Sequence, residues 1–113
     1  MKSRKFSILG AAWKLMYIPA EKDIVKMDNI AGYCDPTERL VVIYEPPADA
    51  NVRNSEKVLA ATVRHEVIHA YLFESGLGEE MIGVQGHNEQ FIDWFALQAV
   101  KIWKTFCELE VAE

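Results

Sequence analysis

The chain of 113 residues is half apolar and 26% charged, which suits one buried core and excludes a disordered or fibrous protein. Its formal net charge of −5, with scattered basic residues, excludes nucleic-acid binding by the chain alone, because phosphate contacts need clustered Lys and Arg. No apolar stretch approaches the roughly 20 residues of a bilayer span. We therefore expect a single domain over residues 1–113 that is cytoplasmic and does not associate with membranes.

The N-terminal segment combines a basic start with a short apolar run, as in a signal peptide. Lys14 interrupts the run, which argues against secretion. The basic cluster of Lys2, Arg4 and Lys5 is expected to be a solvated chain end. Residues Trp13 to Pro19 alternate loosely and are rich in aromatic and β-branched types, which predicts the first strand.

Two further strands are expected before the middle of the chain. A short one ends near Gly32 and Tyr33, Asp35-Pro36-Thr37 supplies a turn, and RLVVIY from Arg39 to Tyr44 predicts a clear strand. Pro46 and Pro47 stop that strand, because proline lacks the amide proton that a ladder requires. The expected arrangement is a short antiparallel β-meander of about three strands.

Two helices follow. The first begins with Asn54 or Ser55 as N-cap, carries apolar residues at helical spacing, and stops at Gly76 after about 20 residues. The second starts near His87 or Asn88. Its apolar stripe predicts a face buried in the core, and the acidic tail from Glu108 is expected to fray. The stripe consists of Phe91, Ile92, Phe95, Ala96, Ala99, Ile102, Trp103 and Phe106.

The motif that indicates chemistry is HEVIH, in the middle of the first predicted helix. His65 and His69 are four residues apart, so both imidazoles project from one helix face, about a turn apart, and suit two ligands of one Zn²⁺. Glu66, next to the first ligand, is the candidate general base toward a water whose pKa the zinc lowers. The longer HExxHxxGxxH pattern is absent, because Leu72 and Ser75 occupy the Gly and His positions.

A third protein ligand is expected from the start of the second helix. Glu89 shares the inward stripe with Ile92 and Ala96, which aims it at the first helix. His87 supplies the imidazole that zinc favours. The spacing does not decide between Glu89 and His87 as the third ligand, and Asp93 is a lesser alternative. Whichever of Glu89 and His87 does not bind the metal is expected to orient one of the ligands.

The residues RHEVIHAYLFESGL and GHNEQF resemble SprT-like zinc metalloproteases. That resemblance implies His65, His69 and His87 as ligands and Glu66 as base, with Phe91 as the matching aromatic. Asn88 stands where a Gly usually follows the third histidine, and no zinc-ribbon or DNA-binding extension is visible.

The wider layout also resembles small HExxH proteins of phages and prophages. The matching pieces are Gly32 to Asp35, His65 to Ala70, Glu74 to Leu77, and Glu89 with Asp93 and Trp94. This resemblance implies Glu89 as the third ligand, as in gluzincins and ImmA/IrrE-like peptidases, and a bacterial cytoplasm as the location.

Together these patterns predict an α+β, minimal zincin-like domain in which the meander packs on the HExxH helix and a second, C-terminal helix delivers Glu89, with His87 as the alternative. Arg39 to Tyr44 is the expected strand beside the cleft, able to bind an extended peptide or protein substrate. The expected function is zinc-dependent peptide hydrolysis with Glu66 as base. The alternatives are a zinc-stabilised binding module with weak or no cleavage and a structural protein without metal.

Overall fold

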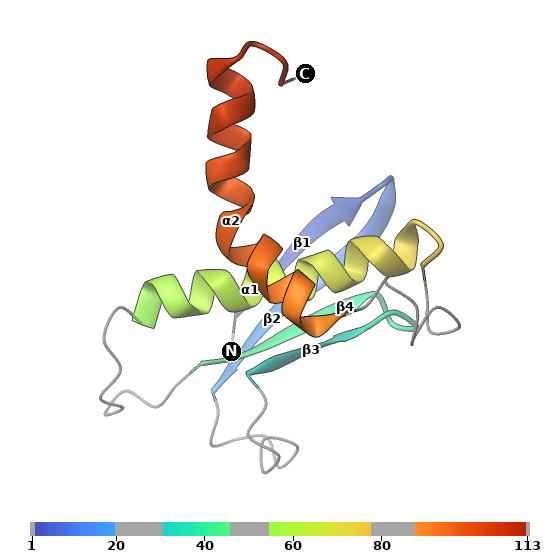
Figure 1. The fold of residues 1–113 in the computed structure, drawn as a ribbon. Helices are drawn as coiled ribbons and strands as arrows, with labels where there is room; N and C mark the ends of the chain where they lie inside the picture. Colours follow the sequence, from blue (N-terminus) through green and yellow to red (C-terminus); the bar gives the residue numbers. More distant parts are fainter. Residues whose placement is uncertain (1, 20–30, 46–54, 78–87, 113) are drawn as a thin grey trace.

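The structure is a computed structural model that describes residues 2–19, 31–45, 55–77 and 88–112. It contains a four-stranded sheet and two helices, which confirms the expected α+β class. Figure 1 shows α1 lying across one face of the sheet, while α2 crosses α1 and then extends away. The expectations for Pro46, Asn54 and His87 lie outside the described residues. The elements are β1 Lys2–Ile8, β2 Ala11–Pro19, β3 Gly32–Asp35, β4 Leu40–Glu45, α1 Ser55–Glu74 and α2 Glu89–Glu108.

The sheet has the order β1-β2-β4-β3 and is mixed. β1 pairs antiparallel with β2, and β3 pairs antiparallel with β4, whereas β2 and β4 are parallel. The predicted antiparallel meander is therefore wrong in its strand order. β4 lies inside the sheet, and its residues Val41, Val42, Ile43 and Tyr44 are all buried. An unbroken apolar run of this kind suits a strand that is covered on both faces.

β1 was not predicted as a strand. Its residues Lys2 to Lys5 are exposed, as a solvated chain end would be, but they pair in register with β2. Leu9 and Gly10 form the two-residue connection, and both have positive φ, 49° and 87°. Such a pair matches a type I′ hairpin turn, whose twist fits the flanking strands.

The main core lies between α1 and one face of the sheet. It consists of Ile8, Trp13, Leu15, Val41, Ile43 and Ala70, with Leu59 and Val63 packed against it. A smaller cluster around Val42 and Tyr44 contains Met16, Ile18, Tyr33 and Leu40. Since side chains alternate along a strand, Val42 and Tyr44 belong to the sheet face opposite to that of Val41 and Ile43.

The C-terminal end of α1 is fixed as the sequence predicts. Gly76 has a φ of 100°, its N–H donates to the Phe73 carbonyl, and the Leu77 N–H donates to the Leu72 carbonyl. This is a Schellman motif, which uses a glycine in the left-handed region. Glu74, the last residue of α1, accepts a hydrogen bond from Trp13 Nε1 at 2.8 Å and pairs with Arg39, and these contacts tie the helix end to the sheet.

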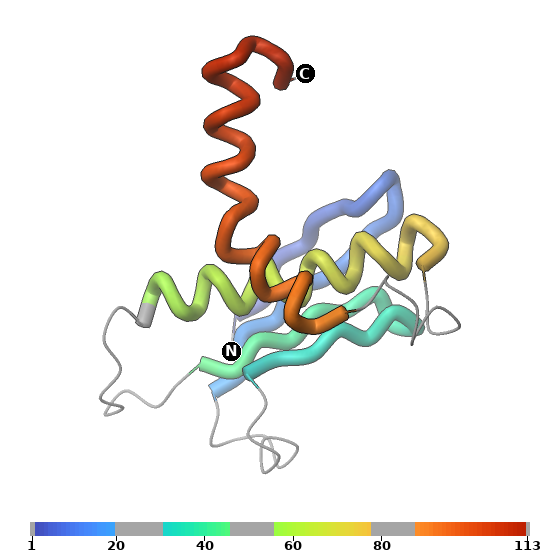
Figure 2. Tube along the Cα trace, viewed as in Figure 1, coloured from blue at the N-terminus to red at the C-terminus, as the bar shows by residue number. Residues whose placement is uncertain are grey.

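α2 begins as predicted, because the Asn88 side chain accepts a hydrogen bond from the Phe91 N–H. Its predicted core stripe is buried only at Ile92 and Ala96, whereas Trp103 is 54% exposed and Phe106 45%. Figure 2 shows why, since the red C-terminal half of α2 extends away from α1 and the sheet.

The end of α2 departs from the expected frayed tail. The Val111 N–H donates to the Phe106 carbonyl, and the Glu110 N–H donates to that of Cys107, so a capping turn follows the helix. Among the described residues, no helix combines the length and apolar composition that crossing a membrane requires.

Candidate metal centre

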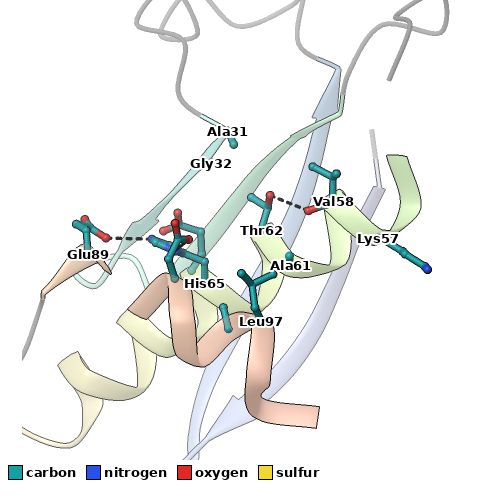
Figure 3. Close-up of a pocket in the computed structure, with 12 residues that line it drawn as sticks. Ala31, Gly32, Lys57, Val58, Ala61, Thr62, His65, Glu89 and Leu97 are labelled. Carbon is teal, nitrogen blue, oxygen red and sulfur yellow. Dashed lines mark hydrogen bonds and ion pairs between the residues drawn. The ribbon is translucent and has the colours of Figure 1, made fainter. Parts of the chain in front are cut away.

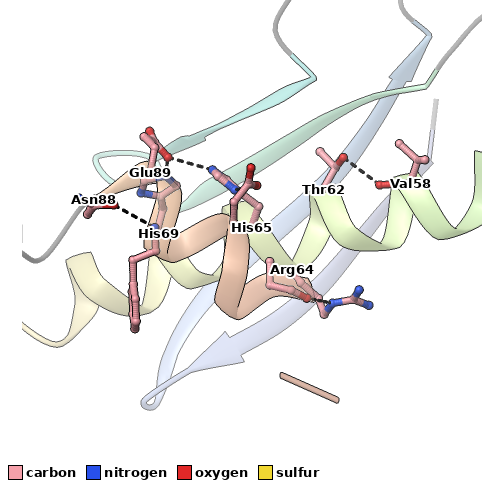
Figure 4. Close-up of polar contacts among 10 residues, drawn as sticks. Val58, Thr62, Arg64, His65, His69, Asn88 and Glu89 are labelled. Carbon is pink, nitrogen blue, oxygen red and sulfur yellow. Dashed lines mark hydrogen bonds and ion pairs between the residues drawn. The ribbon is translucent and has the colours of Figure 1, made fainter. Parts of the chain in front are cut away.

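α1 brings the two histidines of HEVIH to one face. The ring centroids of His65 and His69 are 5.1 Å apart. Figure 4 shows both rings directed toward Glu89, the first residue of α2. The expectation that the helix period brings the two imidazoles together is therefore confirmed.

Glu89 joins the two histidines. Its Oε1 lies 3.0 Å from His65 Nε2 and 3.0 Å from His69 Nε2. One ligand atom from each of the three residues lies within 4.8 Å of the other two. Two imidazoles and a carboxylate form a donor set that catalytic zinc sites use. The residues present thus fit a zinc ion, with both histidines contributed by one helix and the carboxylate by another.

Asp93 contacts the opposite side of the His65 ring. Its Oδ1 lies 2.9 Å from Nδ1, so a carboxylate oxygen faces each ring nitrogen of His65. A neutral imidazole donates only one N–H, and the second contact is favourable only with a further proton or a cation beside that nitrogen. A hydrogen bond from Nδ1 to Asp93 leaves Nε2 as the metal-binding atom, an arrangement common around zinc.

Glu66 follows His65 on α1 and lines the same pocket. Burial raises the pKa of its carboxyl to about 7, the nearby His65 ring lowers the pKa, and the Glu89 carboxylate raises it. A carboxyl group with a pKa near neutrality can both accept and return a proton. The sequence assigned this role to Glu66 from its position next to the first histidine.

A pocket of about 710 Å³ opens beside these residues, between α1, α2 and the start of β3. Figure 3 shows Ala31 and Gly32 on one side of it, with Leu97 on another. The strand beside the pocket is therefore β3, and the expectation of β4 in this position is wrong. β4 has a neighbour on both sides, whereas in the described sheet β3 stands at an edge.

Cys34 of β3 lies near the site without the character of a ligand. Burial raises the pKa of its thiol to about 12, with further raising by the Glu66 and Asp35 carboxylates, and its side chain packs against the main core. A thiol must lose its proton to bind zinc.

Two parts of the site were not predicted correctly from the sequence: β3 as the strand beside the pocket, and Asp93 as the partner of His65. The spacing in the sequence could have indicated the position of Asp93, since it follows Glu89 by four residues and so shares its helix face.

The comparisons with known proteins agree with one of the two resemblances. A family model of SprT-like proteins matches residues 18–111, which include both helices, β3, β4 and the last two residues of β2. No curated protein and no solved structure matched significantly. The resemblance to phage proteins thus stays an expectation. The family has a metallopeptidase-like, zincin-like fold, and the match spans most of the sequence together with the paired histidines, so the chain belongs to the SprT-like family.

Proposed function

We propose that the chain is a zinc-dependent peptidase in which His65, His69 and Glu89 hold the metal and Glu66 transfers protons. The observation that carries the proposal is the contact of one Glu89 oxygen with both Nε2 atoms, at 3.0 Å each, beside an open pocket. A structural ion would not need a pocket, whereas hydrolysis needs space for a substrate next to the metal.

The metal and the protein would divide the chemistry. Zinc, when bound, supplies a Lewis acid that polarises a peptide carbonyl and makes water more acidic. The Glu66 carboxylate accepts a proton from the attacking water and later donates it to the leaving amine, so the proton count balances over one cleavage. Asp93 keeps the His65 ring in one orientation through the Nδ1 contact.

The edge of β3 is the proposed docking strand for the substrate. The Tyr44 N–H donates to the Ala31 carbonyl, which makes residues 31 and 44 a hydrogen-bonded pair of the ladder. Pairing alternates along antiparallel strands, so the N–H and C=O groups of Gly32 and Cys34 point away from β4. An extended peptide could pair with these groups and pass over the histidines. The proposed partner is accordingly a peptide or an unfolded protein segment.

The experiment compares Glu66→Gln with the wild type. Both proteins should bind one zinc per chain, because Glu66 is not among the three proposed ligands. Cleavage of a panel of denatured proteins, followed by mass spectrometry, should fall by about 10²–10⁴-fold in the variant. Equal cleavage by both proteins would remove Glu66 from the mechanism.

A zinc-stabilised binding module is the second candidate. It is favoured by the limited attachment of α2, where only Ile92 and Ala96 are buried and a metal would add a link from Glu89 to α1. In that case zinc would raise the melting temperature, while the wild type would cleave no member of the panel. Absence of stoichiometric zinc would overturn both candidates.

A further inference from the structure

We infer that the pocket beside the metal centre binds one large apolar side chain of the peptide substrate, of the leucine, methionine or phenylalanine class. The inference rests on the proposed peptidase function and names the residues that determine its specificity. The two ends of the pocket differ in chemistry. His65, Glu66, Glu89 and Asp93 lie at the metal end, and Lys57 marks the other.

Between those ends the wall is uncharged. On α1 it is formed by Val58, Ala61 and Thr62, which precede His65 at helical spacing and therefore lie on the face that carries the histidine. The Thr62 hydroxyl donates to the Val58 carbonyl at 2.9 Å, so its proton is already bonded within the helix (Figure 3). Most of the exposed lining surface is apolar.

Two exposed apolar side chains from different helices line this part of the pocket. Val58 of α1 is 54% exposed and Leu97 of α2 is 56% exposed. Exposed apolar groups that converge on one concavity indicate a site for an apolar ligand. Ala61 and Ala96 have short side chains, which leaves room between Val58 and Leu97.

Burial against the uncharged wall disfavours acidic side chains. A substrate carboxylate would lose its water there without gaining a partner, whereas an apolar side chain leaves water without such a cost. At the metal end, the charge of a bound zinc ion would offset the carboxyl groups of Glu66, Glu89 and Asp93. The wall of the pocket thus sets the preference for an apolar side chain.

Binding of small zinc-chelating probes tests this inference independently of turnover. The probes are N-acetyl-leucine, N-acetyl-glycine and N-acetyl-aspartate hydroxamates, titrated calorimetrically into the zinc-loaded full chain. The leucine probe should bind about tenfold or more tightly than the glycine probe, as burial of a leucine side chain implies. The aspartate probe should bind no more tightly than the glycine probe.

Adjacent alanines provide a matched pair of variants. Ala61 lines the pocket, while Ala60 is exposed and is not among the lining residues. Ala61→Phe should fill the space and reduce the leucine-to-glycine preference to about twofold or less, whereas Ala60→Phe should keep it. If Ala61→Phe fails to fold, Leu97→Ala against Val100→Ala offers a milder pair. Val100 is also an exposed apolar residue of α2 but does not line the pocket.

The outcomes separate this inference from the proposed function. If zinc binds and the glycine probe binds, but leucine gives no advantage, the inference is overturned and the metal centre stands. If the leucine preference depends on Ala61 but no protein is cleaved, the pocket assignment stands and hydrolysis is overturned. If no zinc binds, both fail. With active enzyme, cleaved bonds should be flanked by large apolar residues, and Ala61→Phe should shift them toward small ones.

Discussion

At the scale of single residues, His65 is held between two carboxylates. Glu89 faces its Nε2 at 3.0 Å and Asp93 its Nδ1 at 2.9 Å. Because both carboxylates come from the first two turns of α2, the ring's orientation depends on where that helix begins. The Asn88 cap, which accepts a hydrogen bond from the Phe91 N–H, fixes this start.

Asp93→Asn tests the role of the outer carboxylate. An amide can still contact Nδ1 but carries no negative charge, so the ring becomes a weaker donor to zinc. We expect zinc affinity to fall by about 10–100-fold, measured by competition with a chromogenic chelator. Glu108→Gln, an exposed carboxylate at the far end of α2, is the matched control and should leave the affinity unchanged. An equal effect of both variants would indicate a general charge effect.

The third ligand is tested by the pair Glu89→Gln and His87→Gln. Glu89 contacts both histidines, so its loss should lower zinc affinity by at least tenfold, and the loss of His87 should change it little. Zinc titration of both variants against the wild type measures the difference. The reverse order of affinities would make His87 the ligand, as the SprT-like resemblance implies.

The residues of the site were predictable to unequal degrees. The helix period alone gives the juxtaposition of His65 and His69, because four residues span about one turn. The preference for Glu89 needed the face of a second helix, and spacing could not separate it from His87. The contact of Asp93 with Nδ1 depends on how α1 and α2 cross, which no local pattern contains.

At the scale of elements, a strand of the sheet was predictable where its own residues are apolar. β2 and β4 were recognised because each contains enough apolar and β-branched residues. β1 was missed because its first four residues, Lys2 to Lys5, are charged or polar and give no apolar alternation. The parallel pairing of β2 with β4 joins strands that β3 separates in the chain, and a pairing of that kind is set by long-range packing.

α2 contains both a packed half and an exposed half, although its apolar stripe continues through both. Ile92→Ala should reduce the free energy of unfolding by about 2–5 kcal/mol, because Ile92 is fully buried. Trp103→Ala removes a larger side chain, yet should cost less than about 1 kcal/mol, since more than half of Trp103 is exposed. Urea denaturation of both variants measures the contrast. A cost for Trp103→Ala as large as that of Ile92→Ala would mean that this tryptophan is covered in solution.

At the scale of the whole molecule, the sheet and α1 share the main core, while α2 packs on α1. The Arg64 Nε donates to the Ala96 carbonyl at 2.5 Å and adds a polar link between the helices (Figure 4). The proposed ligands come from α1 and α2, so a bound ion would join α2 to the helix that forms the core. Stability and metal binding should therefore be coupled.

The last prediction measures that coupling. At a free zinc concentration of about 100 times its dissociation constant, a single site stabilises the folded state by about 2.7 kcal/mol, a shift in melting temperature on the order of 10 °C. Scanning calorimetry with zinc and with a chelator should give this difference for the wild type and none for His69→Gln, which lacks one donor. Hydrogen exchange should slow most in the first turns of α2, around Glu89 to Ala96, because the ion restrains that segment against α1. An equal thermal shift in His69→Gln, or protection confined to the sheet, would mean that zinc binds elsewhere and that the two helices are not joined through it.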